Sequence, residues 1–217
     1  MPATAFKDVN EKVTFCFASP NELPARHSRN GRLSVLYLLR RELIETAGYD
    51  PNTDTEETVD ARGIKNRLFV SLIAMFTAFD LLAKFQLGDK NGVGKRFVDF
   101  LTSPTGAGMD KSNADLFYAV RNSLVHSFGV PDVDALAKLG LQGVELRRRV
   151  ATKDGGLLVV QRKSWSTPPH TVAELYIDGV FRTLHTAIVN YRAALFYVDT
   201  QRRFAPMFDK YGTIGMS

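Results

Sequence analysis

Cysteine is nearly absent from this chain of 217 residues, which contains only Cys16. One cysteine cannot form an intramolecular disulfide, so the sequence does not belong to the class of small secreted domains that disulfides hold together. In a reducing compartment a lone thiol is usually a small apolar side chain of the core, and we interpret Cys16 in this way. We therefore expect a cytoplasmic protein.

Long uninterrupted apolar stretches are also missing. The first twelve residues, MPATAFKDVNEK, lack the apolar core of a secretory signal because charged residues interrupt them. The most apolar segment, residues 68–79, is too short to cross a bilayer and is bracketed by charged residues. We interpret it as part of a core helix, and we expect no membrane partner.

Several enzyme motifs are lacking as well. His27, His170 and His185 stand singly, so the spacing of a metal site is missing and we expect neither a metal nor another cofactor. No Gly-x-Ser-x-Gly elbow supports acyl transfer. The stretch GDKNGVGK, residues 88–95, has no Ser or Thr after its last lysine and follows a helix, which excludes a P-loop.

Positive charge is in moderate excess, with 28 Lys and Arg against 23 Asp and Glu and a net charge of +5. This balance is compatible with a polyanionic partner such as RNA but does not require one. With 45% hydrophobic residues the chain can bury a core, and its length fits one domain, residues 1–217. We interpret residues 1–30 as an N-terminal extension of that domain.

The spacing of apolar residues predicts an all-α bundle of about five helices. They are expected at residues 32–47, 64–87, 94–101, 112–128 and 171–198. Capping-box patterns at residues 112–115 and 171–174 favour the starts of the last two. The tail, residues 202–217, carries too many large apolar side chains for a free end, so it is expected to pack back onto the bundle.

Residues 143–165 are expected to form a small β-hairpin, because VELRRRV and LLVVQRKSW flank the turn sequence KDGG. The same region places Arg147, Arg149, Arg162 and Lys163 near Trp165, which makes it a candidate surface for a nucleic-acid backbone. Solvated strand faces explain these charges equally well. Alternation along a strand would also divide them between two faces.

The helix expected at residues 112–128 carries a polar cluster. At about 100° per residue, Asn122 and His126 are neighbours on the side away from the apolar residues, with the small side chains of Ala119 and Ser123 beside them. Arg121 lies at the edge of the core with a long reach. An imidazole that exchanges protons near neutrality and a guanidinium that binds phosphate oxygens suit phosphodiester chemistry. The alternative is a solvated histidine and an ordinary salt-bridge arginine.

The residues RNSLVH, 121–126, resemble the signature of the HEPN superfamily (higher eukaryotes and prokaryotes nucleotide-binding). In that signature an arginine is followed after four to six residues by a histidine, often with a polar residue second, and Arg121, Asn122 and His126 match it. The motif lies late in a helix that follows FVSLIAMFTAFDLLAKF and GDKNGVGKRFVDFL, which is similar to the arrangement in bacterial members. The resemblance covers about residues 64–129 and the last helix with its tail, where MFDKYGTIGM adds to the likeness.

This resemblance implies a helical bundle that forms a homodimer, with the arginine and histidine of both subunits in a shared cleft. Many members are metal-independent ribonucleases. For this chain it implies that His126 assists attack of an RNA 2′-hydroxyl on the adjacent phosphate, that Arg121 stabilises the developing charge and that Asn122 orients the reacting groups. The product would be a 2′,3′-cyclic phosphate.

The rival interpretation is a non-catalytic HEPN-like module that binds nucleotide, RNA or a protein partner. The resemblance alone points to antiviral defence, RNA processing or a toxin-antitoxin pair, in which an antitoxin would be the partner. No residue of the chain selects among these settings.

Asp80 adds a hypothesis about support of the cluster. A carboxylate on an otherwise apolar central helix needs a partner, and Arg121 is one candidate. Lys84, four residues further along the same helix, is the other. Both partners are kept as expectations for Asp80.

Overall fold

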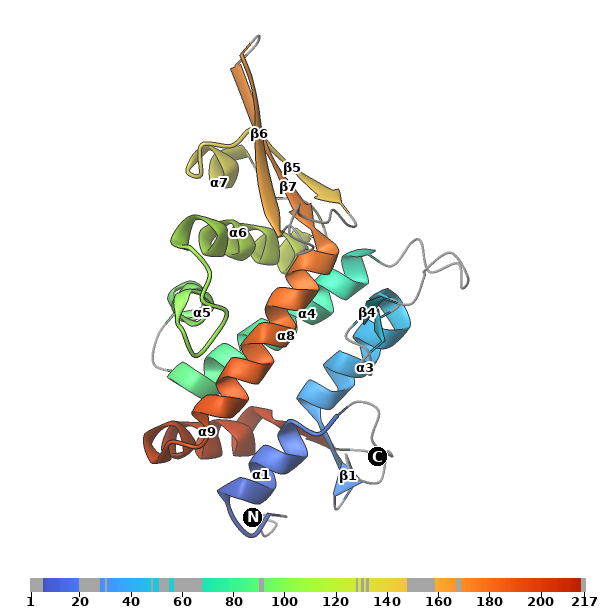
Figure 1. Ribbon diagram of the computed structural model, residues 1–217, viewed down its shortest axis with the longest axis vertical. Coiled ribbons are helices and arrows are strands. Elements are labelled where there is room, and N and C mark those ends of the chain that lie inside the picture. The colour runs from blue at the N-terminus through green and yellow to red at the C-terminus, as the bar shows by residue number, and fades with distance from the viewer. Residues whose placement is uncertain are drawn as a thin grey trace.

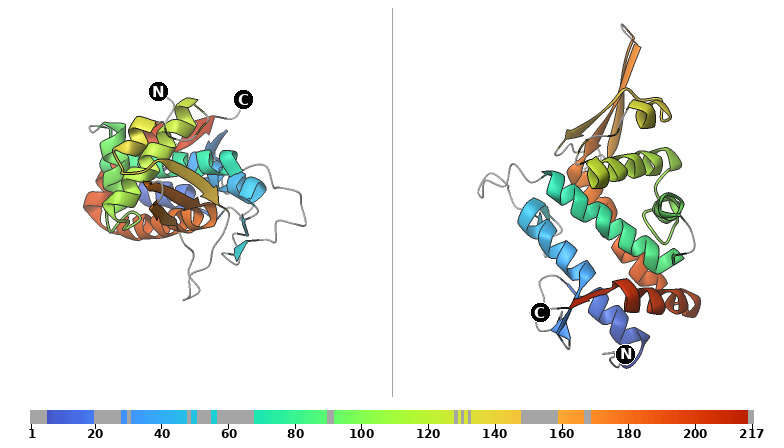
Figure 2. Two further views of the ribbon diagram at one scale, coloured as in Figure 1. Left: turned by 90° about the horizontal axis from the view of Figure 1, so that it is seen from above. Right: turned by 180° about the vertical axis from the view of Figure 1, so that it is seen from behind.

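The computed structural model describes residues 6–19, 28–29, 31–47, 49–50, 55–56, 68–89, 92–127, 129, 131, 133–147, 159–166 and 169–215. Within these residues the chain forms eight helices and eight strands. The helices pack into a bundle, and strands β6 and β7 project from the end of the bundle at which α8 begins (Figures 1 and 2). The two described ends of the chain lie together at the opposite end.

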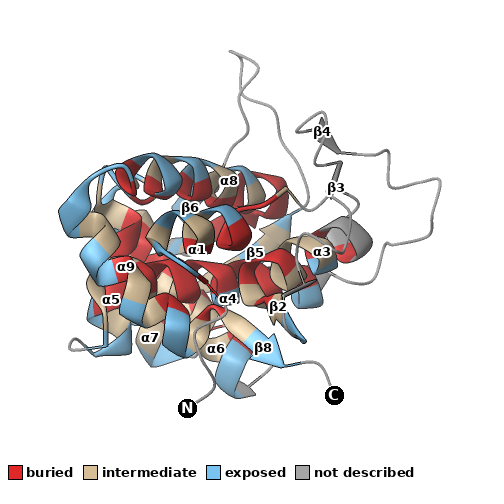
Figure 3. Cartoon of the chain, turned by 90° about the horizontal axis from the view of Figure 1, so that it is seen from below, coloured by how far each residue is buried: buried red, intermediate tan, exposed pale blue. Residues whose placement is uncertain are grey.

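Helix α4, Leu68–Leu87, forms the centre of the bundle. It packs against α3 (Val35–Ala47), α5 (Val93–Thr102), α6 (Lys111–Ser127), α8 (Ile177–Ala194) and α9 (Val198–Tyr211). Its apolar residues surround the whole helix, which is the pattern of an element enclosed by others. Figure 3 shows buried residues along α4 and on the inward sides of the helices around it.

Aromatic rings join α4 to α5 and α6. The ring centroids of Phe76 and Phe117 are 5.5 Å apart, and those of Phe79 and Phe97 are 6.3 Å apart, both in edge-to-face arrangements. All four side chains are fully buried. Because such rings contribute large buried areas and prefer this geometry, they fix the position of α6 on the bundle.

The apolar helix α4 is longer than its most apolar segment. By length and composition, residues Phe69–Leu87 could cross a membrane, but most of the stretch is buried inside the fold. The prediction that the apolar segment ends at residue 79 and is too short to cross a bilayer is therefore wrong, because the apolar helix continues to Leu87. The interpretation as a core helix is confirmed by burial, since residues such as Leu72, Met75 and Leu82 are fully enclosed.

The N-terminal region and the C-terminal tail pack together. Helix α1, Val9–Cys16, contacts α9, and Lys12 on α1 forms an ion pair with Asp209 on α9 at 2.7 Å. The tail does pack back onto the bundle as expected, because Phe204 and Phe208 are fully buried. Cys16 is also buried, in agreement with its interpretation as a core side chain, and burial raises the pKa of its thiol.

Short strands complete the structure at both ends of the bundle. Strand β2 (Arg32–Ser34) pairs antiparallel with β1 (Ser28–Arg29) and with β8 (Thr213–Gly215), so that the tail closes a three-stranded sheet. Strands β3 (Tyr49–Asp50) and β4 (Thr55–Glu56) form an antiparallel pair. A third sheet contains β5 (Gly143–Arg147), β7 (Pro169–Tyr176) and β6 (Val160–Ser166), in that spatial order.

The prediction of an all-α bundle of about five helices is wrong, since eight helices and three small sheets are present among the described residues and the fold is mixed α/β. The predicted hairpin at residues 143–165 is also wrong. Strand β6 pairs antiparallel with β7, while β5 pairs parallel with β7 on its other side. The expected turn at residues 153–156 lies outside the described residues.

The misassigned segment is residues 171–176, which we predicted as the start of a helix. It is strand β7, and α8 begins only at Ile177. Residues 172–180 are all buried, including Glu174 and Asp178, and a segment that is buried at every position has neither the period of an exposed strand nor that of a surface helix. The segment is a strand because it pairs with β5 on one side and β6 on the other. The pairing with β5 joins segments that are distant in the sequence, so local periodicity does not indicate it.

Candidate functional site

Helix α6 presents the polar cluster at the end of the bundle next to the third sheet. Its first turn is capped by Asp110, whose carboxylate accepts a hydrogen bond from the backbone N–H of Asn113 at 2.9 Å. The predicted capping residue, Ser112, is already inside the helix. The predicted inward side is correct, since Leu116, Phe117, Val120 and Leu124 are all buried. His126 therefore faces away from the core and is exposed.

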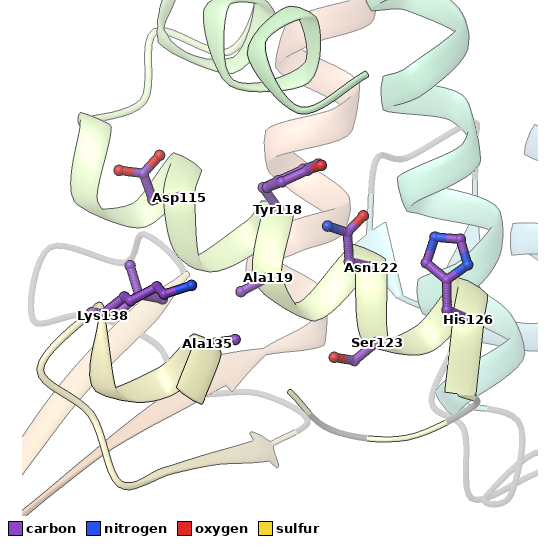
Figure 4. A pocket seen from close by; sticks show the side chains of 9 residues that line it. Asp115, Tyr118, Ala119, Asn122, Ser123, His126, Ala135 and Lys138 are labelled. Atoms are coloured by element: carbon purple, nitrogen blue, oxygen red, sulfur yellow. The ribbon is translucent and has the colours of Figure 1, made fainter. Parts of the chain in front are cut away.

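An open pocket of about 420 Å³ lies between α6 and α7, Val133–Ala137 (Figure 4). Asn122, Ser123 and His126 of the predicted cluster line it. The other lining residues are Asp115, Tyr118 and Ala119 of α6, together with Ala135, Lys138 and Leu139. The small side chains of Ala119 and Ser123 both line this pocket.

Arg121 points to a different neighbour. Its Nε and Nη2 atoms donate hydrogen bonds to Oδ2 of Asp80 on α4 at 2.8 and 2.5 Å, and Nη1 donates to Oδ1 of Asn122 at 3.0 Å. Both members of the ion pair are largely buried, with side chains 15% and 14% exposed. The expectation that Asp80 pairs with Arg121 is confirmed. Lys84, the alternative partner, lies over the ring of Tyr211 at 4.3 Å.

The structure thus brings the predicted residues together only in part. Asn122 connects the ion pair of Arg121 and Asp80 with the pocket, since it accepts a hydrogen bond from Arg121 and lines the pocket together with His126. Arg121 itself does not line the pocket. Five residues along a helix correspond to about 140° of rotation, so Arg121 faces α4 while His126 faces the pocket. A phosphate must therefore lie at the edge of the pocket, near Asn122, to contact both.

Two pocket residues were missed by the sequence analysis. Tyr118 lies one turn before Asn122 in the row that also contains Asp115 and His126, so helical periodicity alone could have found it. Lys138 follows α7, and nothing in the sequence indicates that this short helix packs beside α6. Figure 4 shows Lys138 and His126 at opposite ends of the pocket.

Comparisons with known proteins find no match. No family model, curated protein or solved structure is similar enough to this chain to indicate a family. The likeness to the HEPN superfamily consequently depends on the residues themselves.

The candidate basic patch on the third sheet is divided between two faces. Arg162 faces α6, where its guanidinium donates to the side chains of Asn113 at 2.9 Å and Ser112 at 2.8 Å. Arg147 and Lys163 point to the other face and both bind the carboxylate of Glu174, at 3.3 and 2.8 Å. Arg149 lies outside the described residues. The two faces therefore do not present a continuous basic surface.

Glu174 and Glu145 together balance the charges of Arg147 and Lys163 on the outer face of this sheet, because Glu174 pairs with both cations and Glu145 pairs with Arg147 at 2.5 Å. Glu174 lies on the central strand β7, where hydrogen bonds from Lys163 and from the hydroxyl of Tyr176 hold its pKa below the usual value. Burial, together with the neighbouring carboxylate, raises the pKa of Tyr176 to about 12. A helix at residues 171–198, as predicted from the sequence, would not place Glu174 beside Lys163, whereas strand β7 does. The alternation of side chains along a strand correctly predicts that Arg162 lies on one face of the sheet while Arg147 and Lys163 lie on the other.

Proposed function

We propose that this chain is a metal-independent endoribonuclease of HEPN type that acts as a homodimer. The observation that carries the proposal is an exposed imidazole, His126, that shares an open pocket with Asn122, whose amide contacts a guanidinium fixed by Asp80. These groups supply a proton acceptor and donors for phosphate oxygens within about one and a half turns of α6. RNA brings its own nucleophile, the 2′-hydroxyl, so the protein needs only to move protons and stabilise charge.

The proposed reaction starts with removal of the 2′-hydroxyl proton by His126. The 2′-oxygen then attacks the adjacent phosphorus, the bond to the 5′-oxygen breaks, and that oxygen takes up a proton. In a homodimer the His126 of a second copy supplies this proton, which balances the reaction. The products are a 2′,3′-cyclic phosphate and a 5′-hydroxyl.

Arg121 and Asp80 have complementary roles in this proposal. The hydrogen bonds to Asp80 and Asn122 use three of the five N–H groups of the guanidinium, which leaves two for a phosphate oxygen. Asp80 is a positioning residue, because it holds the guanidinium in one orientation and does not contact the substrate. A preorganised donor stabilises the transition state without the cost of reorienting it.

The test is cleavage of mixed RNA by the purified protein in the presence of a chelator. We expect cleavage with 2′,3′-cyclic ends. His126→Ala should lower the rate about 100-fold or more, as is typical of a lost general acid or base, and Arg121→Ala should lower it about as much. His170→Ala is the matched control, since His170 is an exposed histidine of the third sheet that does not line the pocket, and its ring lies 5.6 Å from that of Trp165. Equal cleavage by His126→Ala and wild type would refute the proposal.

A second candidate function is a non-catalytic module that binds RNA, nucleotide or a protein partner. The commitment of Arg121 to Asp80, together with its absence from the pocket wall, favours this alternative. Binding of RNA by wild type without any cleavage selects it. The cytoplasmic setting and a role in defence, RNA processing or a toxin-antitoxin pair stay proposals that rest on the family likeness alone.

A further inference from the structure

The α7 side of the pocket carries a cation that the proposed cleavage does not use. Lys138 is exposed and follows the short helix α7, and its ammonium forms no ion pair with any residue that the structure describes. Asp115 is the acidic residue of the pocket lining, and Lys111 on its own helix binds it at 2.5 Å. Two lysines, Lys138 in the lining and Lys111 beside it, therefore accompany the one carboxylate of Asp115 at this end of the pocket, which favours an anionic ligand there.

Tyr118 lies along the pocket between the two ends. Its ring packs against Phe97 of α5 with centroids 6.0 Å apart. Gly94 makes room for this ring, because a Cβ atom at that position would lie 2.5 Å from Cζ of Tyr118. The glycine-rich stretch before α5 thus has a packing role, in which it lets an aromatic ring lie at the pocket wall. The ring is held in place by α5 and presents a surface on which a base can stack.

The pocket is too long for one phosphate to occupy both ends. Asp115 and His126 are eleven residues apart on α6, which corresponds to about 16 Å along the helix. Figure 4 shows Lys138 across from Asp115 and Ala119, with Tyr118 and Asn122 on the way to His126. A ligand that contacts both ends must be an extended chain with charges at intervals. A single-stranded nucleic acid has this character, since its backbone carries one charge per nucleotide.

We propose that Lys138 and Tyr118 form a second subsite of the pocket, which holds the strand next to the cleavage position. Lys138 binds a backbone phosphate, and the ring of Tyr118 stacks on a neighbouring base. The subsite rests on the proposed function in taking RNA as its ligand. It adds that the pocket binds a single strand over more than one nucleotide, so a mononucleotide should bind more weakly than a short oligonucleotide.

The test uses a fluorescein-labelled 2′-O-methyl oligonucleotide, which lacks the attacking hydroxyl and cannot be cut by the proposed reaction. Its dissociation constant is measured by fluorescence anisotropy over a series of salt concentrations. Loss of one phosphate contact to a single strand lowers the slope of log affinity against log salt by about 0.7. We expect this change for Lys138→Ala. We also expect binding weakened about five-fold or more for Tyr118→Leu, and little change for Tyr118→Phe, which keeps the ring.

Arg202→Ala is the matched control for charge. Arg202 is 76% exposed and pairs with Asp199, and both belong to α9, which lies at the other end of the molecule from α7 (Figure 1). An unchanged salt slope for Lys138→Ala, or the same change in Arg202→Ala, overturns the subsite. So does a wild type that does not bind the oligonucleotide at low salt.

The outcomes for the subsite and for the nuclease are separable. If the protein cleaves ordinary RNA and Lys138→Ala binds the oligonucleotide as wild type does, the nuclease proposal stands and the subsite proposal is refuted. Binding that depends on Lys138, without cleavage of ordinary RNA, removes the nuclease and leaves the subsite.

Discussion

Replacing Asp80 with asparagine removes the charge that holds Arg121 while keeping the shape of the side chain. Both hydrogen bonds from the guanidinium end on one oxygen, Oδ2, so a single substitution affects the whole pair. Arg121 would stay largely enclosed between α4 and α6 with its positive charge uncompensated. Asp80→Asn therefore tests whether this ion pair supports the candidate site.

The magnitude follows from the burial of the pair. Removing one partner of a fully buried ion pair costs about 3–5 kcal/mol, and a hydrogen bond to a charged group contributes about 1.5–3 kcal/mol. The two side chains retain 15% and 14% exposure, so some solvation is left to the guanidinium. We expect the free energy of unfolding to fall by about 2–3 kcal/mol. At about 2–4 °C for each kcal/mol in a domain of this size, Tm should fall by about 4–12 °C.

The assay is urea unfolding followed by circular dichroism, with Asp115→Asn as the matched control. Asp115 also pairs with a basic residue, Lys111, but the two side chains are 34% and 70% exposed. Such a surface pair contributes about 0.5 kcal/mol or less. If Asp80→Asn loses no more stability than Asp115→Asn, the ion pair with Arg121 does not support the site and the reasoning is refuted. Unchanged RNA cleavage in Asp80→Asn would also remove its positioning role.

Three further predictions concern the fold. Phe204→Ala should lower the unfolding free energy by about 3–5 kcal/mol because its ring is fully enclosed, while Phe196→Ala, at 87% exposure, should change it by less than about 0.5 kcal/mol, as measured by urea unfolding. The pKa of Glu174 is lower in the folded state than in the unfolded state, where it is about 4.3. The ionised carboxylate therefore stabilises the fold above that pH, and this stabilisation is lost as the pH falls through the folded-state pKa. Glu174→Gln should consequently lose less stability than wild type when the pH is lowered below about 4.5, as acid unfolding measures. Gly106→Ala should cost about 3 kcal/mol in urea unfolding, because its Cβ would lie 1.9 Å from a backbone carbonyl oxygen of α5, whereas Gly92 has open space and Gly92→Ala should cost much less.

Each of these predictions has a contrary outcome. Similar losses for Phe204→Ala and Phe196→Ala would mean that α9 is not part of the core. An acid-unfolding curve unchanged by Glu174→Gln would show that the interactions of Glu174 with Lys163 and Tyr176 do not stabilise the sheet. Equal effects at Gly106 and Gly92 would contradict the tight turn after α5.

Two kinds of feature could be predicted from the sequence: helices with a clear spacing of apolar residues, and a buried charge that requires a partner. The inward side of α6 followed from Leu116, Phe117 and Val120, and the core position of α4 followed from apolar residues on all its sides. The Asp80–Arg121 pair could be anticipated, because a carboxylate in an apolar helix requires a compensating group. These inferences depend on local periodicity and on the cost of burying charge, which a single sequence carries.

What could not be predicted depends on contacts between distant segments. Residues 172–176 are all buried, so they show no alternation between buried and exposed positions, and they fit a strand or a helix until the pairing with β5 and β6 is known. Lys138 belongs to the pocket only because α7 packs beside α6. The neutralisation of Arg147 and Lys163 depends on Glu174, which the strand order brings between them.

The most direct test of the nuclease uses an RNA strand that is 2′-O-methylated at every position except one. Wild-type protein is incubated with this strand in a chelator, and the ends of the products are determined by mass spectrometry. The account predicts one cut, on the 3′ side of the nucleotide that has the free hydroxyl, with a 2′,3′-cyclic phosphate that is lost in His126→Ala. A cut at a methylated position, or a product with a 3′-hydroxyl end, would contradict it.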